Sequence, residues 1–188
     1  MAALEPFLYF VTLTTIICLI VYIIWIYNGL VRLKLNIAKS YANIDVLLKQ
    51  RSDELPKLID TVKGYMKHEK ETLANLTQMR SKLAEATTLR AKADLNNQIS
   101  ESLKTIFAVA ENYPKLRANE NFLQLQLRIT GLENEIADRR EFYNDSVTNY
   151  NYRIQSFPDT LIAKLFKYNE EQVFVANTQE RQQVDSSM

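Results

Sequence analysis

The chain has 188 residues, of which 47% are hydrophobic and 24% are charged, and its formal net charge is +1. This near-neutral balance excludes the strongly basic surface typical of nucleic-acid-binding proteins, so no nucleic-acid partner is expected. Three glycines and four prolines are too few for a chain built from hairpins and tight turns, which favours an all-α fold. The single cysteine, Cys18, excludes an intrachain disulfide.

The first elements along the chain are a short tail at residues 1–6 and an apolar segment at residues 7–27. The segment is bounded by Phe7 and Tyr27 and contains 21 residues without a charge. As a helix it would be about 31 Å long, close to the thickness of the hydrocarbon core of a bilayer. A cleavable secretory signal is the alternative, but no basic residue precedes the apolar run and no small-residue cleavage site follows it. We therefore predict a retained, single-pass transmembrane helix.

Charges on either side of this segment predict its orientation. Only Glu5 precedes it, whereas Arg32, Lys34 and Lys39 follow within a dozen residues. Because basic residues stay on the cytoplasmic side, the tail at 1–6 is expected to be extracytoplasmic and residues 28–176 to be cytoplasmic. We name Arg32, Lys34 and Lys39 the basic collar and expect it to contact lipid head groups.

The next element is a long amphipathic helix. Apolar residues recur at helical spacing from the membrane segment to about Ala86, and Pro56 and Gly64 are the residues that could interrupt the pattern. Because proline has no amide donor, Pro56 predicts either a kink or a new helix capped by Asp53. We favour a kinked, nearly continuous helix that extends the transmembrane helix.

Two more long helices are expected, followed by short elements. One covers about residues 93–111 and ends before a turn at Pro114. The other has apolar positions spaced alternately by three and four residues, which is typical of a coiled-coil seam. The seam positions are Phe122, Leu125, Ile129, Leu132, Ile136, Arg140, Tyr143, Val147, Tyr150, Ile154 and Phe157. A short amphipathic segment at 158–168 and a flexible polar tail at 177–188 complete the chain.

Residues 139–158, RREFYNDSVTNYNYRIQSFP, combine rings and amides in one stretch. Tyr143, Tyr150 and Phe157 are seven residues apart, so their rings are expected in the core. The asparagine after each tyrosine lies at the edge of the seam, and a buried tyrosine hydroxyl is expected to find an Asn or Arg partner on a neighbouring helix. Tyr152 falls off this face and is either an interaction residue or a solvated ring.

Two arginines, Arg51 and Arg140, lie on or near apolar faces. A buried arginine must be paired, so we predict a polar network of these two residues with Tyr143 and Tyr150. The candidate carboxylate partners are Asp45, Glu54, Glu133 and Asp138. The pattern leaves open whether the two arginines share one carboxylate.

No catalytic or metal-binding pattern is complete. The stretch KHEKET at 67–72 begins like the metalloprotease motif HExxH, but Thr72 stands where the second histidine is required and His68 is the one histidine of the chain. His68 is therefore expected to be a surface or polar-contact residue of a helix. We predict that the protein is not an enzyme and uses no cofactor or metal.

Four segments together carry a family resemblance. They are IYNGLVRLK, YANIDVLLKQRSDELPKLIDTVKGYMKHEKETL, NYPKLRANENFLQLQ and GLENEIADRREFYNDSVTNYNYRIQSFP. In order and spacing they resemble the LemA family, over about residues 27–167. The resemblance implies an N-terminal anchor and an antiparallel bundle of long helices, but no reaction, cofactor or substrate. The chain departs from the family pattern at Glu54, at Lys57 and at Tyr41, where tryptophan is common.

Two functions follow as expectations. The first is a non-enzymatic helical scaffold, anchored in the cell (inner) membrane, that forms homo-oligomers at the cytoplasmic face. The alternative is a monomeric or dimeric adaptor that binds a membrane enzyme or sensor. Membrane lipid, further copies of the chain and a membrane protein are the candidate partners. The candidate interaction residues are Phe107, Tyr152, Leu165, Phe166 and Phe174.

Overall fold

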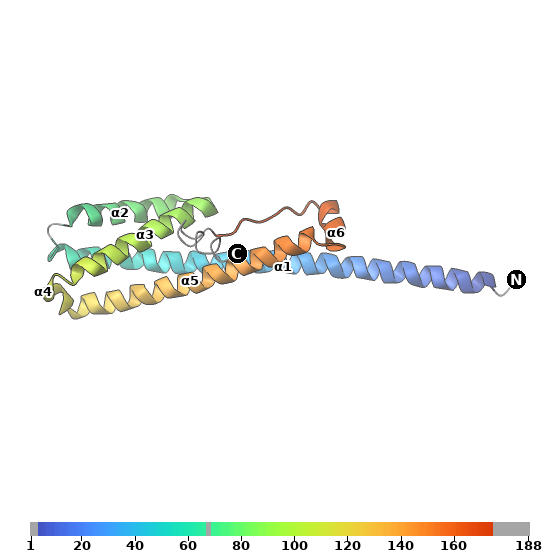
Figure 1. Cartoon of the computed structure of the whole chain (residues 1–188), viewed down its shortest axis with the longest axis horizontal. Helices are drawn as coiled ribbons and strands as arrows, with labels where there is room; N and C mark the ends of the chain where they lie inside the picture. Colours follow the sequence, from blue (N-terminus) through green and yellow to red (C-terminus); the bar gives the residue numbers. More distant parts are fainter. Residues whose placement is uncertain (1–3, 67–68, 175–188) are drawn as a thin grey trace, which may run out of the picture. The chain divides into compact units, whose positions relative to one another are not determined.

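The computed structural model describes residues 4–66 and 69–174, and within these ranges it contains helices and no strand (Figure 1). The helices are α1 (Leu4–Lys63), α2 (Lys70–Glu85), α3 (Leu89–Ala110), α4 (Pro114–Arg117), α5 (Glu120–Gln155) and α6 (Asp159–Leu165). The predicted all-α fold is confirmed. Two earlier expectations, the surface position of His68 and the flexible tail at 177–188, concern residues outside these ranges.

The chain divides into two compact units. Unit 1 comprises residues 1–40 and 144–173, and unit 2 comprises residues 41–143 and 174–188. The long helices α1 and α5 contribute to both units. Within unit 2, α2 and α3 pack side by side as a helical hairpin (Figure 1).

The N-terminal part of α1 has the length and apolar composition of a membrane-crossing helix. The side chains of residues 7–22 are all exposed, which is what a lipid-facing helix requires. Large rings are among them, since Phe7 is 63% and Phe10 is 68% exposed. This apolar helix indicates a single-pass membrane protein.

The first long helix ends earlier than predicted. It stops at Lys63 rather than near Ala86, and a turn follows in which the amides of Tyr65 and Met66 both donate to the carbonyl of Val62 at 2.9 Å. Gly64 lies in this turn. Glycine loses the most backbone freedom in a helix, so it is a natural point of termination. The break is therefore at Gly64 and not at Pro56.

Pro56 lies inside α1, which continues through it. A proline in a helix removes the hydrogen bond to the carbonyl four residues earlier, which here belongs to Ser52. The structure supplies another donor, because Arg80 Nε of α2 donates to the Ser52 carbonyl oxygen at 3.0 Å. A contact between helices thus replaces the hydrogen bond that Pro56 removes. The alternative prediction, a new helix after Asp53, is wrong because α1 continues through this position.

Side chains cap two of the later helices, α3 and α5. Thr88 precedes α3, and its hydroxyl oxygen accepts a hydrogen bond from the Ala91 amide at 3.2 Å, so this helix starts before the expected residue 93. Pro114 starts α4, a short helix where only a turn was expected. Asn119 caps α5 by accepting from the Phe122 amide at 3.1 Å, and its amide donates to the Tyr65 hydroxyl at 3.3 Å.

Most predicted seam positions of α5 are buried. Phe122, Ile129, Ile136, Tyr143, Val147, Tyr150 and Ile154 are buried, whereas Leu125, Leu132 and Arg140 are half-buried. The last predicted position is wrong, because Phe157 is 80% exposed. Helix α5 ends at Gln155, so the spacing of an α-helix no longer sets the direction of this ring.

Candidate functional site

The most buried polar group of unit 2 is the guanidinium of Arg51 on α1, whose side chain is 0% exposed. Its Nη1 donates to the Glu133 carboxylate of α5 and to Ser100 Oγ at 3.1 Å, and its Nη2 donates to Asn96 Oδ1 at 2.7 Å. Ser100 Oγ in turn donates to Glu133 Oε2 at 2.6 Å. One arginine therefore connects α1 with α3 and α5, and its carboxylate partner is Glu133.

Burial lowers the pKa of Arg51, and the charge of Glu133 and its hydrogen bond oppose this change. Because an arginine pKa starts far above neutrality, the side chain stays charged. A buried ion pair of this kind fixes which residues face one another more than it adds net stability. Arg51 Nε is buried without a partner among the described atoms, so the network is incompletely satisfied.

Glu54, one turn along α1, is the second buried charge of this region, with only 5% of its side chain exposed. It accepts from Arg128 Nε of α5 at 3.0 Å and from Lys57 Nζ at 3.0 Å. Two departures from the family pattern, Glu54 and Lys57, are therefore partners of each other. We call residues 51–57 of α1 the polar turn, because they make polar contacts with α2, α3 and α5.

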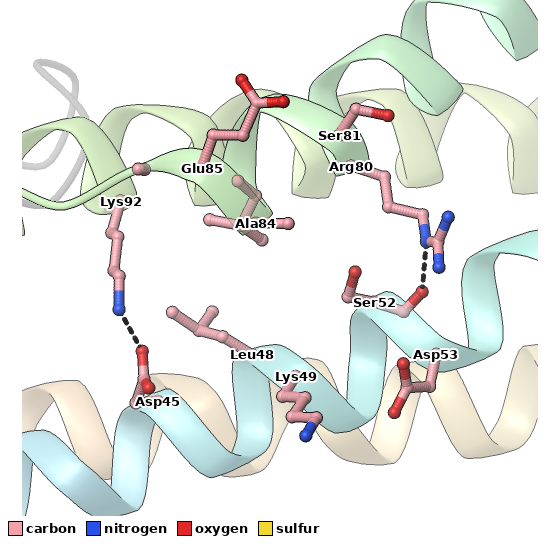
Figure 2. Close-up of a pocket in the computed structure, with 12 residues that line it drawn as sticks. Asp45, Leu48, Lys49, Ser52, Asp53, Arg80, Ser81, Ala84, Glu85 and Lys92 are labelled. Carbon is pink, nitrogen blue, oxygen red and sulfur yellow. Dashed lines mark hydrogen bonds and ion pairs between the residues drawn. The ribbon is translucent and has the colours of Figure 1, made fainter.

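A cleft of about 560 Å³ adjoins the polar turn in unit 2. Figure 2 shows Leu48 of α1 and Ala84 of α2 projecting into it from opposite sides. At one end Lys92 donates to Asp45, and at the other Arg80 donates to the Ser52 carbonyl (Figure 2). The walls carry three acidic and three basic side chains, which are Asp45, Asp53, Glu85, Lys49, Arg80 and Lys92. The cleft thus suits a ligand of mixed charge with an apolar part.

Lys92 is the cleft residue with a shifted pKa. Burial alone would lower the pKa, but the hydrogen bonds to Asp45 and Tyr41 outweigh burial and raise it above the usual value. The ammonium also lies 5.5 Å from the centre of the Tyr41 ring, a cation–π distance. Lys92 is therefore a fixed positive charge at neutral pH and not a candidate general base.

The other predicted network residues do not join Arg51 in one cluster. Arg140 Nη1 donates to Asn97 Oδ1 at 3.2 Å, and its guanidinium lies 4.9 Å from the ring centre of Phe174. Tyr143 meets the same ring edge-on at 6.5 Å. The two arginines thus bind neighbouring asparagines of α3, Asn96 for Arg51 and Asn97 for Arg140. Phe174 is 0% exposed, so its prediction as an interaction residue is wrong.

Tyr150 belongs to unit 1, where its hydroxyl donates to the main-chain oxygen of Asn169 at 3.0 Å. Asn151 binds the same segment twice, donating to the Glu171 carbonyl at 2.8 Å and accepting from the Glu171 amide at 2.9 Å. The expected partner on a neighbouring helix is therefore a non-helical main-chain segment, residues 168–173. Sequence reasoning missed this segment, because it has no periodic pattern.

The remaining predicted residues have diverse surroundings. Tyr152 and Leu165 are exposed at 73% and 72%, whereas Phe107 is half-buried with its ring 6.3 Å from that of Phe122 in the core. Phe166 is 51% exposed, although one side of its ring packs on Tyr27 at 4.8 Å between centroids.

The three residues of the basic collar, Arg32, Lys34 and Lys39, are all exposed. Lys34 also forms an ion pair with Glu171 at 3.6 Å. Within the described ranges, no three His, Cys, Asp or Glu side chains are grouped closely enough to hold a metal ion.

Comparison with known proteins identifies the family. The LemA family profile matches residues 40–187 of the chain. The chain is 31% identical to a protein named Protein LemA from Metamycoplasma hominis, over 85% of this chain and 74% of that protein. Two magnetosome proteins of Paramagnetospirillum magneticum, MamQ 1 and MamQ 2, are each 27% identical over 39% of this chain, a match that spans 27% of their own length. The chain belongs to the LemA family.

Proposed function

We propose that this protein is a non-enzymatic helical scaffold, anchored by the helix at residues 7–27, that self-associates at the cytoplasmic face of the cell (inner) membrane. The orientation, with the N-terminus outside, rests on the exposed basic collar that follows the apolar segment. Membrane lipid and further copies of the chain are its proposed partners, without a cofactor or nucleic acid.

The observation that carries self-association is an apolar exposed face on α5 in unit 2. Leu127 is 74% exposed, Phe142 is 59% exposed and Leu123 is 41% exposed. At about 100° per residue, these side chains and Gly131 lie within roughly 100° of one another around the helix. A Cβ at Gly131 would meet no atom within 4 Å, so no residue in the described part of the chain covers that position. We call these four residues the α5 outer face.

This face is suited to contact between copies. Two exposed leucines and one aromatic ring around a glycine allow another helix to approach closely and bury apolar area. Arg139 and Glu135 form an ion pair at 3.6 Å. At about 100° per residue, this pair borders the outer face next to Gly131 and Phe142, so charged side chains lie at the edge of the apolar surface. An isologous contact through the outer face would pair α5 with α5 of a second copy.

The polar side chains of unit 2 support a structural role rather than a chemical one. Arg51, Glu54 and Arg80 each contact another helix through ion pairs or hydrogen bonds, which favours a bundle with one defined arrangement. Such a bundle presents its outer helix faces in fixed positions. That property is what a scaffold needs.

The test is the mass of the full-length protein in mild detergent, measured by light scattering after size exclusion. We expect a discrete oligomer, and expect Leu127→Glu to shift it towards the monomer because a carboxylate on the outer face cannot be buried. Asn121→Glu is the matched control, since it adds the same charge at an exposed site about 120° around α5 from Leu127. A monomeric wild type, also after crosslinking in membranes, would refute the scaffold.

An adaptor for a membrane enzyme or sensor is the second candidate, and the cleft beside the polar turn favours it. A cleft of about 560 Å³ with both signs of charge could hold a short segment of mixed charge from a partner protein. For an adaptor, the same light-scattering measurement would give a monomer or dimer. Crosslinking in membranes would then give a stoichiometric foreign partner, and Ala84→Trp, which fills the cleft, would abolish that product.

A further inference from the structure

Unit 1 has three large apolar side chains, two on α6 and one just before it, that stay exposed among the residues the structure describes. Phe157 is 80% exposed, Leu165 is 72% exposed and Leu161 is 59% exposed. Leu161 and Leu165 are four residues apart on α6 and share one side of it. Two other positions of the helix are packed, since Ile162 is 8% exposed and Ala163, on the opposite side, is 2% exposed. We call Phe157, Leu161 and Leu165 the α6 apolar row.

Contacts within unit 1 place α6 beside the end of the apolar segment of α1. Phe166, directly after α6, packs its ring on Tyr27 at 4.8 Å between centroids. Arg153, which pairs with Asp159 of α6, lies 5.4 Å from the ring centre of Trp25. Arg153 Nη1 would also lie 3.0 Å from a Cβ at Gly29, so α5 and α1 approach closely here.

The change from exposed to buried side chains along α1 occurs at the same end of the apolar segment. Residues 7–22 are exposed without exception, whereas Ile26 is 1% exposed and Leu30 is 0% exposed. Protein packing on α1 therefore begins within the last turn of the apolar segment. In a membrane-spanning helix, Trp25 and Tyr27 at this end are aromatic residues of the interface. The segment that packs on them is at the depth of the lipid head groups.

The charges near α6 fit the same location. Lys164 lies in the last turn of α6 and Lys167 follows the helix, and the exposed Arg32 of the collar is five residues beyond Tyr27. Asp159, the acidic residue of α6, is neutralised by Arg153. Exposed apolar side chains beside lysines are typical of segments that lie in the membrane interface and are attracted by anionic lipid.

We propose that α6 is a second membrane-binding element, which inserts Phe157, Leu161 and Leu165 into the boundary between head groups and acyl chains of the cytoplasmic leaflet. This inference rests on the proposed membrane anchor and adds a contact beside it. One transmembrane helix leaves rotation about its axis free, whereas α6 on one side of α1 fixes which side of unit 1 faces the lipid. The occupant of the apolar row is the bilayer, not a protein.

Fluorescence quenching in reconstituted vesicles tests the proposal with the full chain. Trp25 is the natural single tryptophan and reports on the anchor. In a Trp25→Phe background, Leu165→Trp reports on the apolar row. Leu35→Trp is the matched control, because Leu35 is also exposed, at 65%, but lies about 12 Å further along α1 than Tyr27. Phosphatidylcholine and phosphatidylglycerol vesicles carry bromine atoms either near the head group or deep in the acyl chain.

We expect the tryptophan at 165 to be quenched several-fold more than the one at 35, and more by shallow than by deep bromines. Quenching of Trp25 without any excess at 165 would overturn this inference and leave the anchor standing. Absence of quenching at Trp25 would overturn both. Shielding of the tryptophan at 165 from aqueous acrylamide without lipid quenching would mean that a protein covers the row, which also overturns the proposal.

Discussion

Different interactions stabilise the interior of each of the two units. Unit 2 has a continuous apolar core around Leu58, Leu76 and Phe122, and buried charged groups such as Arg51 connect its helices. Unit 1 packs a short strip of buried residues of α1, among them Leu30, and binds its last segment through the amide of Asn151. Buried charged side chains thus connect the helices of unit 2, whereas hydrogen bonds to main-chain atoms hold the last segment of unit 1.

This difference has a consequence for stability. Charged pairs inside a core are costly to break, because the remaining partner stays buried without compensation. Hydrogen bonds between a side chain and a main-chain segment are worth about 1 kcal/mol each, and their loss releases only the segment they hold. Damage to unit 2 should therefore affect the whole bundle, and damage to unit 1 should stay local.

The largest expected effect is in unit 2 at Glu133. Glu133→Gln leaves the fully buried Arg51 without its counter-charge, and we expect a loss of about 3 kcal/mol in the free energy of unfolding. Adding Arg51→Met should recover more than half of this loss, because an apolar side chain needs no partner. Urea unfolding of the full chain in detergent, followed by circular dichroism, measures both values.

The control for this pair is Glu135→Gln, also on α5. Glu135 pairs with Arg139 at the surface, where each side chain is about half exposed, so its loss should cost less than about 0.5 kcal/mol. Equal effects of Glu133→Gln and Glu135→Gln would show that the buried pair in unit 2 is no more costly to break than a surface pair, and would contradict this prediction.

The next effect is local and belongs to unit 1. Asn151→Leu removes both hydrogen bonds to Glu171, worth about 2 kcal/mol together, so amide exchange in residues 168–173 should become about 30-fold faster. Hydrogen exchange with mass spectrometry measures this, and the core amides of α3 should keep their rates. Asn149→Leu makes the same replacement at an exposed site two residues away. Faster exchange throughout unit 2 would contradict the local character of these bonds.

Much of this arrangement follows from residue spacing, and the exceptions have physical causes. The seam of α5 predicted the burial of Tyr143 and Tyr150, since a 3–4 repeat places side chains on one face. The exposure of Phe157 and the burial of Phe174 did not follow, because both lie outside regular helix. The continuity of α1 through Pro56 depends on Arg80, which is distant in sequence, and local propensity carries no information on such a donor.

A double-mutant cycle at Pro56 tests that compensation in unit 2. Arg80→Leu should cost about 1 kcal/mol, because the Ser52 carbonyl loses its donor. In a Pro56→Ala background the helix regains its own amide donor, so the same Arg80→Leu change should cost little. The coupling free energy from urea unfolding of the four proteins measures the compensation. An identical cost in both backgrounds would mean that Arg80 acts only through the charges of the cleft.

The smallest effect concerns the hydroxyl of Tyr150 and depends on pH. Burial raises the pKa of Tyr150 above its usual value, and the nearby charges of Glu171 and Tyr168 also raise this pKa. The stabilisation from a raised pKa is fully present below the unfolded pKa of about 10 and is lost as pH rises through the folded pKa. At pH 7, Tyr150→Phe should cost about 1 kcal/mol for the lost bond to the Asn169 oxygen.

Above pH 10 the two proteins should converge, since the wild type loses a contribution that phenylalanine never had. Urea unfolding at a series of pH values measures the gap, with Tyr152→Phe as the control for removing a hydroxyl from an exposed ring. A gap that stays constant with pH would mean that the Tyr150 hydroxyl titrates alike in the folded and unfolded chains. In that case the Tyr150 hydroxyl would not make the stability of unit 1 fall above pH 10. The difference between unit 1 and the charge-paired unit 2 would then rest on the Asn151 hydrogen bonds alone.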